Sequence, residues 1–194
     1  MVHILEDIEH YAEENNVPIM QKEGIEFLKD YIEKNNIVNI LEIGTAIGYS
    51  AIKMCINKNI MITTIERDKK RFEIALKNIK KVKLEDQITI INDDAFNIDL
   101  KDKFDLIFID AAKGQYIKFF EKFEKNLNRN GTIISDNLYF HGLTKQIETI
   151  KSRNLRQLVR KINKYVDFIT NHPYYDTKIY NIGDGIGVTR RKNE

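Results

Sequence analysis

Short β-branched apolar runs alternate along this chain with longer segments whose apolar residues recur at helical spacing. Such alternation is typical of a parallel sheet covered by helices. The runs that we expect to form parallel strands are residues 37–44, 60–67, 87–93, 104–110 and 131–137. Helices are expected over residues 4–16, 20–36, 50–57, 68–82, 114–130 and 151–173. The pattern predicts an α/β fold with helices on both faces of the sheet.

The C-terminal part of the chain is predicted to add two antiparallel strands to the sheet. Residues 175–183 and 185–191 have the pattern of two further strands, and the turn Gly183-Asp184-Gly185 separates them. Tight glycine-containing turns join antiparallel strands, so we expect a hairpin here. The sheet is therefore predicted to have seven strands and to be mostly parallel.

Length and composition favour a single domain. The chain has 194 residues, of which 42% are hydrophobic and 31% are charged, as in an ordinary globular protein. No linker or repeat divides it, so one domain is expected over residues 1–194. Its predicted parts are N-terminal helices (1–36), a core that carries the candidate chemistry (37–140), a basic helical segment (141–172) and a C-terminal hairpin (173–194).

Several features predict a cytoplasmic protein with no membrane partner. No apolar run is long enough to cross a bilayer, and the N-terminus is acidic where a signal peptide would be basic and then apolar. Cys55 is the single cysteine, so no intramolecular disulfide can form. The net charge of +2 means that any basic binding surface must be local.

Candidate chemistry gathers at the carboxyl ends of the predicted strands, where open parallel sheets bind ligands. The first strand runs into a turn in which Gly44 and Gly48 allow close backbone approach. Glu66, at the end of the second strand, can accept hydrogen bonds from both hydroxyls of a ribose. A plain strand-to-helix turn and a solvated acid are the alternatives. Together the two features favour an adenosine-containing cofactor.

Oxygen-bearing side chains also end the later strands. Asp110 follows the fourth strand, and Asp136 with Asn137 follows the fifth. These three suit a hard divalent cation, although Asp110 could instead cap a helix. Beside a cation and partly desolvated, the charged form of Lys113 is disfavoured, so Lys113 can accept a proton. A solvated surface charge is the alternative for this lysine.

Five ordered blocks of the chain resemble the cation-dependent class I O-methyltransferases, which include catechol O-methyltransferase: LEIGTAIGYSAI, TIERD, NDDAF, FIDAAKGQY and GTIISDN. The resemblance implies a Rossmann-like methyltransferase fold. It implies that the S-adenosylmethionine site is formed by Met20, Glu42, Gly44, Ser50, Glu66, Asp94, Ala95 and Asp110. It also implies that Mg²⁺ or Mn²⁺ is held by Asp110, Asp136 and Asn137, and that Lys113 is the general base.

The predicted helix over residues 151–173 has two distinct faces. Its apolar face comprises Leu155, Leu158, Val159, Ile162, Val166 and Ile169. The opposite face carries Arg153, Arg156, Arg160 and Lys164. These four are candidate RNA-binding residues because such a stripe suits phosphate contacts. An ordinary solvated surface is an equally good alternative.

With this helix and the segments NHPYYDT and GDGIGV, the chain resembles a bacterial branch of the family, the tRNA 5-hydroxyuridine methyltransferases. That resemblance implies methylation of 5-hydroxyuridine to 5-methoxyuridine at wobble position 34 of the tRNA anticodon. The N-terminal helices and the resemblance also imply a homodimer. Tyr139, Phe140 and His141 could stack on the base or cover it, and core or dimer contacts are equally good alternatives for these residues.

Two alternatives stay open for the function. A small-molecule catechol or phenol O-methyltransferase would share every core residue with a tRNA enzyme. A non-catalytic RNA-binding module is disfavoured because Lys113 and the candidate cation ligands are all retained.

Overall fold

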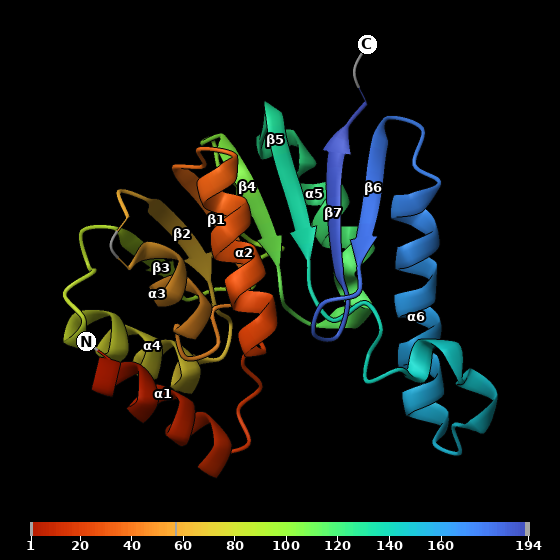
Figure 1. The fold of residues 1–194 in the computed structure, drawn as a ribbon, viewed down its shortest axis with the longest axis horizontal. Helices are drawn as coiled ribbons and strands as arrows, with labels where there is room; N and C mark the ends of the chain where they lie inside the picture. The colour runs from red at the N-terminus through yellow and green to blue at the C-terminus, as the bar shows by residue number, and fades with distance from the viewer. Residues whose placement is uncertain (1, 57, 193–194) are drawn as a thin grey trace.

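A seven-stranded mixed sheet forms the centre of the computed structural model, which describes residues 2–56 and 58–192 (Figure 1). The strand order is β3-β2-β1-β4-β5-β7-β6. The strands are β1 (Asn39–Ile43), β2 (Met61–Ile65), β3 (Ile88–Ile91), β4 (Phe104–Ile109), β5 (Leu127–Ser135), β6 (Tyr175–Tyr180) and β7 (Ile186–Arg191). The strands from β3 to β5 are parallel, whereas β7 is antiparallel to β5 and β6. The predicted sheet and C-terminal hairpin are confirmed.

Helices cover both faces of the sheet, as the sequence pattern predicts. They are α1 (Val2–Glu14), α2 (Lys22–Lys34), α3 (Tyr49–Cys55), α4 (Lys69–Lys81), α5 (Tyr116–Phe123) and α6 (Arg153–Thr170). Short 3₁₀ turns are η1 (Lys113–Gln115), η2 (Glu124–Asn126), η3 (Leu143–Lys145) and η4 (Ile147–Thr149). Within the described ranges, no helix has the length and apolar character needed to cross a membrane. Residues 1, 57, 193 and 194 lie outside the described part. All four belong to the predicted domain, and residue 57 also belongs to the predicted helix over 50–57.

Two hydrophobic clusters lie on opposite faces of the sheet because successive strand residues point to opposite sides. On β1, Ile40 packs with residues of α1, α2 and α3, whereas Leu41 packs with α5 and α6. On β4, Leu106 and Ile107 divide in the same way. Both faces of the central strands are therefore buried, which explains their continuous apolar sequence.

The predicted helix over residues 114–130 is wrong in its second half. α5 ends at Phe123, and β5 begins where the helix was expected to continue. Leu127 is buried and pairs with Phe104 of β4. The Asn126 side chain donates two hydrogen bonds, of 2.8 and 2.9 Å, to carbonyl oxygens of the loop before β4. These tertiary contacts override the local helical spacing.

The order of the strands determines where a ligand can bind. β1 lies between β2 and β4. The chain therefore continues from β1 to β2 on one side and from β4 to β5 on the other side of the sheet. The carboxyl ends of β1 and β4 therefore flank the point where strand order reverses, which is the usual ligand site of such sheets. In Figure 1 the arrows of these strands point downward, so these ends lie at the lower edge of the sheet.

Candidate active site

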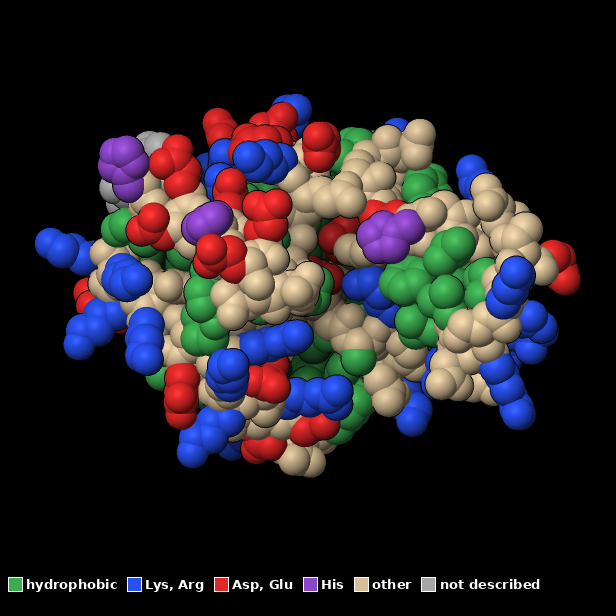
Figure 2. All heavy atoms as spheres, turned by 90° about the horizontal axis from the view of Figure 1, so that it is seen from below, with side chains coloured by type: hydrophobic (Ala, Val, Ile, Leu, Met, Phe, Trp, Pro, Cys, Tyr) green, Lys and Arg blue, Asp and Glu red, His purple; other side chains and the backbone are tan. Residues whose placement is uncertain are grey.

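A cavity of about 640 Å³ opens at the carboxyl edge of the sheet. Its walls include the following residues that the sequence predicts for the cofactor, the cation or the base: Gly44, Glu66, Asp94, Ala95, Asp110, Lys113 and Asn137. Figure 2 looks onto this edge and shows a hollow near the middle of the face, with acidic side chains inside it. The topology thus brings together residues that are far apart in the sequence.

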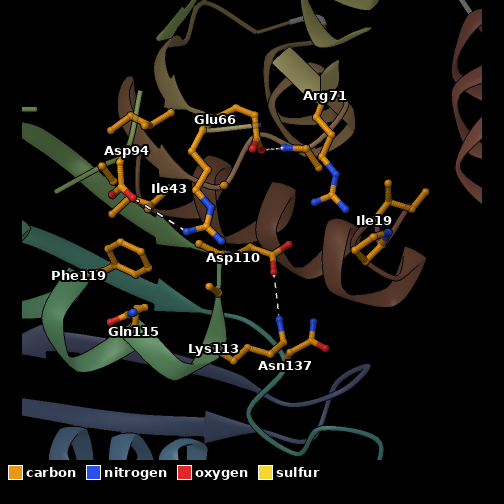
Figure 3. A pocket seen from close by; sticks show the side chains of 18 of the residues that line it. Ile19, Ile43, Glu66, Arg71, Asp94, Asp110, Lys113, Gln115, Phe119 and Asn137 are labelled. Carbon is orange, nitrogen blue, oxygen red and sulfur yellow. Dashed lines mark hydrogen bonds and ion pairs between the residues drawn. The ribbon is translucent and has the colours of Figure 1, made fainter. Parts of the chain in front are cut away.

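The cavity has two chemically different ends. In Figure 3, Asp110 lies between them, with Glu66 and Asp94 on one side. Lys113 and Asn137 lie on the other side of Asp110. The first end matches the predicted adenosine site, and the second matches the predicted cation and base.

Some predicted residues lie behind the cavity wall rather than in it. Met20 is buried in the core, while its neighbours Ile19 and Gln21 line the cavity. Glu42 and Ser50 are buried, and the Ser50 hydroxyl donates a hydrogen bond to Glu42. The contacts of these side chains with a cofactor stay predictions.

The glycine-rich turn after β1 holds Glu66 in place. The backbone N–H of Ala46 donates to Glu66 Oε2 at 2.8 Å, and the N–H of Asp68 donates to Oε1 at 2.8 Å. Glu66 is buried, so it is not the solvated acid that the sequence left open. Each carboxylate oxygen can accept a second hydrogen bond, so the orientation suits a ribose diol.

Lys113 faces two acidic residues at the other end of the cavity. Its Nζ lies 3.5 Å from Asp110 Oδ1, and the two side chains are only 16% and 21% exposed. Lys113 Nζ also donates to the Tyr116 hydroxyl at 3.5 Å, and that hydroxyl donates to the carbonyl oxygen of Asp136 at 3.2 Å. Lys113 is therefore an enclosed side chain whose Nζ lies at the cavity wall, not an ordinary surface charge.

The predicted cation ligands fit an oxygen-binding divalent ion. Burial, together with the nearby Asp110 carboxylate, raises the pKa of Asp136 to about 7. A cation between two such carboxylates would balance their charge. Asn137 Nδ2 donates a hydrogen bond to Asp136 Oδ2 at 2.8 Å. The amide oxygen of Asn137 takes no part in this bond. Across the described residues, no three His, Cys, Asp or Glu side chains form a metal-binding group, and binding of a cation by Asp110, Asp136 and Asn137 stays a prediction.

Beneath the cavity floor, Glu42 is a buried carboxyl group. Thr64 Oγ1 donates to Glu42 Oε2 at 2.5 Å, and Thr45 Oγ1 lies 2.6 Å from Thr64 Oγ1. Burial raises the pKa of Glu42 to about 7, even though the hydrogen bonds from Ser50 and Thr64 oppose this shift. The proton state of Glu42 therefore changes near neutral pH.

We expect the substitution Glu42→Gln to change how stability depends on pH. Because the folded-state pKa lies above the usual value of 4.5, the folded protein keeps a proton that the unfolded chain loses. Wild-type stability therefore falls as the pH rises from about 4.5 to about 7. Between pH 5 and pH 8, the unfolding free energy of the variant should gain about 2 kcal/mol relative to wild type. Urea unfolding at both pH values measures this difference.

The exposed Glu73 provides a control for this measurement. The variant Glu73→Gln should show the same pH dependence as wild type. If Glu42→Gln also follows wild type, Glu42 does not titrate near neutral pH in the folded protein.

Several residues at or beside the cavity escaped the sequence interpretation. Phe96 and Phe119 line it, and their rings stack at 4.8 Å with an interplanar angle of 8°. Arg71, in the first turn of α4, also lines it. Asp184, predicted only as a turn residue, contacts the loop that carries His141. The sequence offered one signal for these residues: Phe96 follows closely after the acidic residues at the carboxyl end of β3, where ligand-binding residues are expected.

The predicted basic helix is present as α6, but its four candidate RNA-binding residues differ in exposure. Arg153, Arg160 and Lys164 are exposed on α6. Arg156 is half-buried, and its guanidinium donates to the carbonyl oxygen of Ile150 at 3.1 and 2.6 Å. Arg156 therefore does not share the exposure of the other three cations, because its guanidinium anchors the chain that enters α6.

Comparisons with known proteins agree with this geometry. A family model described as O-methyltransferase matches residues 2–192. A caffeoyl-CoA O-methyltransferase from Populus kitakamiensis is 28% identical over 175 residues, covering 85% of this chain and 74% of that protein. A catechol O-methyltransferase from Niastella koreensis is 39% identical over 113 residues, covering 54% of this chain and 51% of that protein.

Solved structures extend the similarity over almost the whole chain. A Staphylococcus aureus protein, provisionally named a caffeoyl-CoA O-methyltransferase, is 38% identical with a TM-score of 0.91, covering 97% of this chain and 92% of that chain. An O-methyltransferase from Bacillus cereus in complex with S-adenosylhomocysteine (SAH) is 25% identical with a TM-score of 0.83, covering 98% and 91%. The cavity at the carboxyl edge thus belongs to a fold that binds this cofactor product in a relative.

Proposed function

Since this chain belongs to the O-methyltransferase family and is an S-adenosylmethionine-dependent enzyme, we propose that it methylates 5-hydroxyuridine at wobble position 34 of tRNA. One observation carries the choice of substrate. The exposed cations Arg153, Arg160 and Lys164 lie on α6, which packs against the η1 turn that begins at Lys113. In Figure 1, α6 begins near the bottom of the view, on the side toward which β4 and β5 point. These exposed cations, on a helix that packs beside the cavity, support the proposal that α6 contacts tRNA phosphates.

The chemistry requires alignment and a base. Glu66 and the turn after β1 position the adenosine end of the methyl donor, and Lys113 takes the proton of the substrate hydroxyl as the methyl group is transferred. A divalent cation, when bound by Asp110, Asp136 and Asn137, supplies electrostatic stabilisation of a substrate oxyanion. The base of 5-hydroxyuridine carries its hydroxyl next to a carbonyl, so it offers two adjacent oxygens to this end of the cavity. An anticodon base also lies in a loop, which lowers the cost of presenting it.

The decisive experiment is nucleoside mass spectrometry. Purified protein is incubated with S-adenosylmethionine, Mg²⁺ and tRNA that contains 5-hydroxyuridine, and catechol is assayed in parallel. We expect 5-methoxyuridine to form faster than methylated catechol and to disappear when EDTA is added. Methylated catechol with unchanged tRNA would overturn the proposed substrate, and full activity in EDTA would overturn the cation site.

The three exposed cations of α6 give a further prediction. Replacing Arg153, Arg160 and Lys164 together by Ala should weaken tRNA binding and reduce the slope of log affinity against log salt by about 3. Affinity for SAH should not change, because none of the three lines the cavity. Filter binding at several salt concentrations measures the slope.

Arg156 provides the matched control. The single variant Arg156→Ala should lower the melting temperature, because it removes the hydrogen bonds to Ile150. Its salt slope should stay that of wild type. An unchanged slope in the triple variant would remove the main physical argument for RNA.

Small catechols are the second candidate substrates. The relatives from Populus and Niastella are named for caffeoyl-CoA and catechol, and the same cavity chemistry suits both substrate classes. The catechol arm of the mass spectrometry experiment separates the two functions.

A further inference from the structure

The loop after β5 is held against the cavity by the hairpin turn between β6 and β7. The N–H of Tyr139 donates to the carbonyl oxygen of Asp184 at 2.7 Å, and the N–H of Leu138 donates to that of Gly185 at 2.9 Å. The N–H of His141 donates to the side chain of Asp184, with 2.6 Å to Oδ1. The loop and the turn thus form one connected unit beside the site.

The backbone of this loop is strained at the residues that line the cavity. Phe140 has φ of 45° and His141 has φ of 56°, in the left-handed region that side chains other than glycine disfavour. Such strain persists only where the surrounding structure fixes it, and it concentrates at functional sites. Here the bonds to Asp184 fix the conformation that places His141 in the cavity wall.

Asp184 has an unused oxygen that faces His141. Its side chain is only 7% exposed, and Oδ2 is buried without a hydrogen-bond partner among the described residues. That oxygen lies 3.5 Å from Nδ1 of His141, whose side chain is 69% exposed. A buried carboxylate oxygen without a donor is costly, so an N–H at Nδ1 is the natural partner.

We propose that His141 is a substrate-contacting specificity residue and that Asp184 is its positioning residue. The proposal rests on the proposed function and deepens it. With its proton on Nδ1 and directed at Asp184, the neutral imidazole presents Nε2 as an acceptor in the cavity wall. The matching group on the substrate is a ring N–H. A uracil ring carries one at N3, next to its 4-carbonyl, whereas a catechol ring has none.

The test compares 5-hydroxyuridine with its N3-methyl derivative as nucleoside substrates. Wild-type enzyme should prefer the N3–H substrate by about tenfold in kcat/KM, mainly through KM. His141→Ala should raise KM for the N3–H substrate and reduce that preference to about onefold. The exposed His10, on α1, gives the matched control, and His10→Ala should keep the wild-type preference.

Asp184→Asn separates positioning from loop structure. The amide oxygen can still accept the N–H of His141, whereas the amide nitrogen now donates to Nδ1 and moves the imidazole proton to Nε2. This variant should keep the wild-type melting temperature within about 2 °C but lose the preference for the N3–H substrate.

The outcomes distinguish this inference from the proposed function. Wild-type enzyme that methylates catechol but neither tRNA containing 5-hydroxyuridine nor the two nucleosides overturns the proposed substrate and the N–H contact together. Wild-type activity on 5-hydroxyuridine with an unchanged substrate preference in His141→Ala overturns the specificity role alone. An equal loss of kcat on both nucleosides also overturns it, because that result indicates a structural role for the loop.

Discussion

Replacing Lys113 by Met is expected to lower kcat by about three orders of magnitude, within the range that a general base contributes. The Lys113 side chain is enclosed, with Nζ 3.5 Å from Asp110 Oδ1, and Met keeps much of its length but has no amine to accept a proton. The adenosine end of the cavity is formed by other residues, so affinity for SAH should stay within about threefold. Single-turnover methylation and isothermal titration calorimetry measure the two quantities.

Lys161 provides a matched control for this prediction. It extends from α6 to the same turn, where its Cδ lies 3.2 Å from the position of a β-carbon on Gly114. It does not line the cavity, so Lys161→Met should retain kcat on a nucleoside or catechol substrate within about threefold. If Lys113→Met keeps more than a tenth of wild-type kcat, another group or water takes the proton.

The sheet was predictable because its signals are local. Each parallel strand is a short apolar run, and the glycine turn at residues 183–185 indicates the hairpin. The end of α5 was not predictable, because Leu127 and Asn126 form their contacts with β4 and the loop before it, more than 20 residues away. Helical spacing carries no information about such partners.

The site was predictable as far as topology determines it. Parallel strands direct their carboxyl ends to one edge, so Asp110 and Asn137 had to lie close together. The Asp184–His141 contact joins residues 43 positions apart and exists only because β7 pairs with β5. The partial burial of Arg156 was not predictable, because a helical wheel orders residues around an axis but does not locate the carbonyl oxygen of Ile150 beside it.

Gly44→Ala is expected to cost about 4 kcal/mol or more of unfolding free energy, which is exceptional for one methyl group. Gly44 has φ of 102°, and an added β-carbon would lie 2.2 Å from the carbonyl oxygen of Asp110. That oxygen belongs to the backbone at the end of β4, so it can move only if the β1–β4 edge opens. The same movement would displace the Asp110 side chain from the cavity centre. Urea unfolding measures the stability, and SAH titration at low temperature measures the site.

Gly142 provides a control that distinguishes the cost of a positive φ from the cost of the steric contact at Gly44. It also has a positive φ, of 76°, but an added β-carbon there would have nothing within 4 Å. Gly142→Ala should therefore cost only about 1 kcal/mol, the usual penalty for a side chain in the left-handed region. If the two variants lose similar stability, the contact between β1 and β4 is not what requires a glycine after β1. A much larger loss at Gly44, accompanied by loss of SAH binding, would show that the packing of these two strand ends holds the active site in its shape.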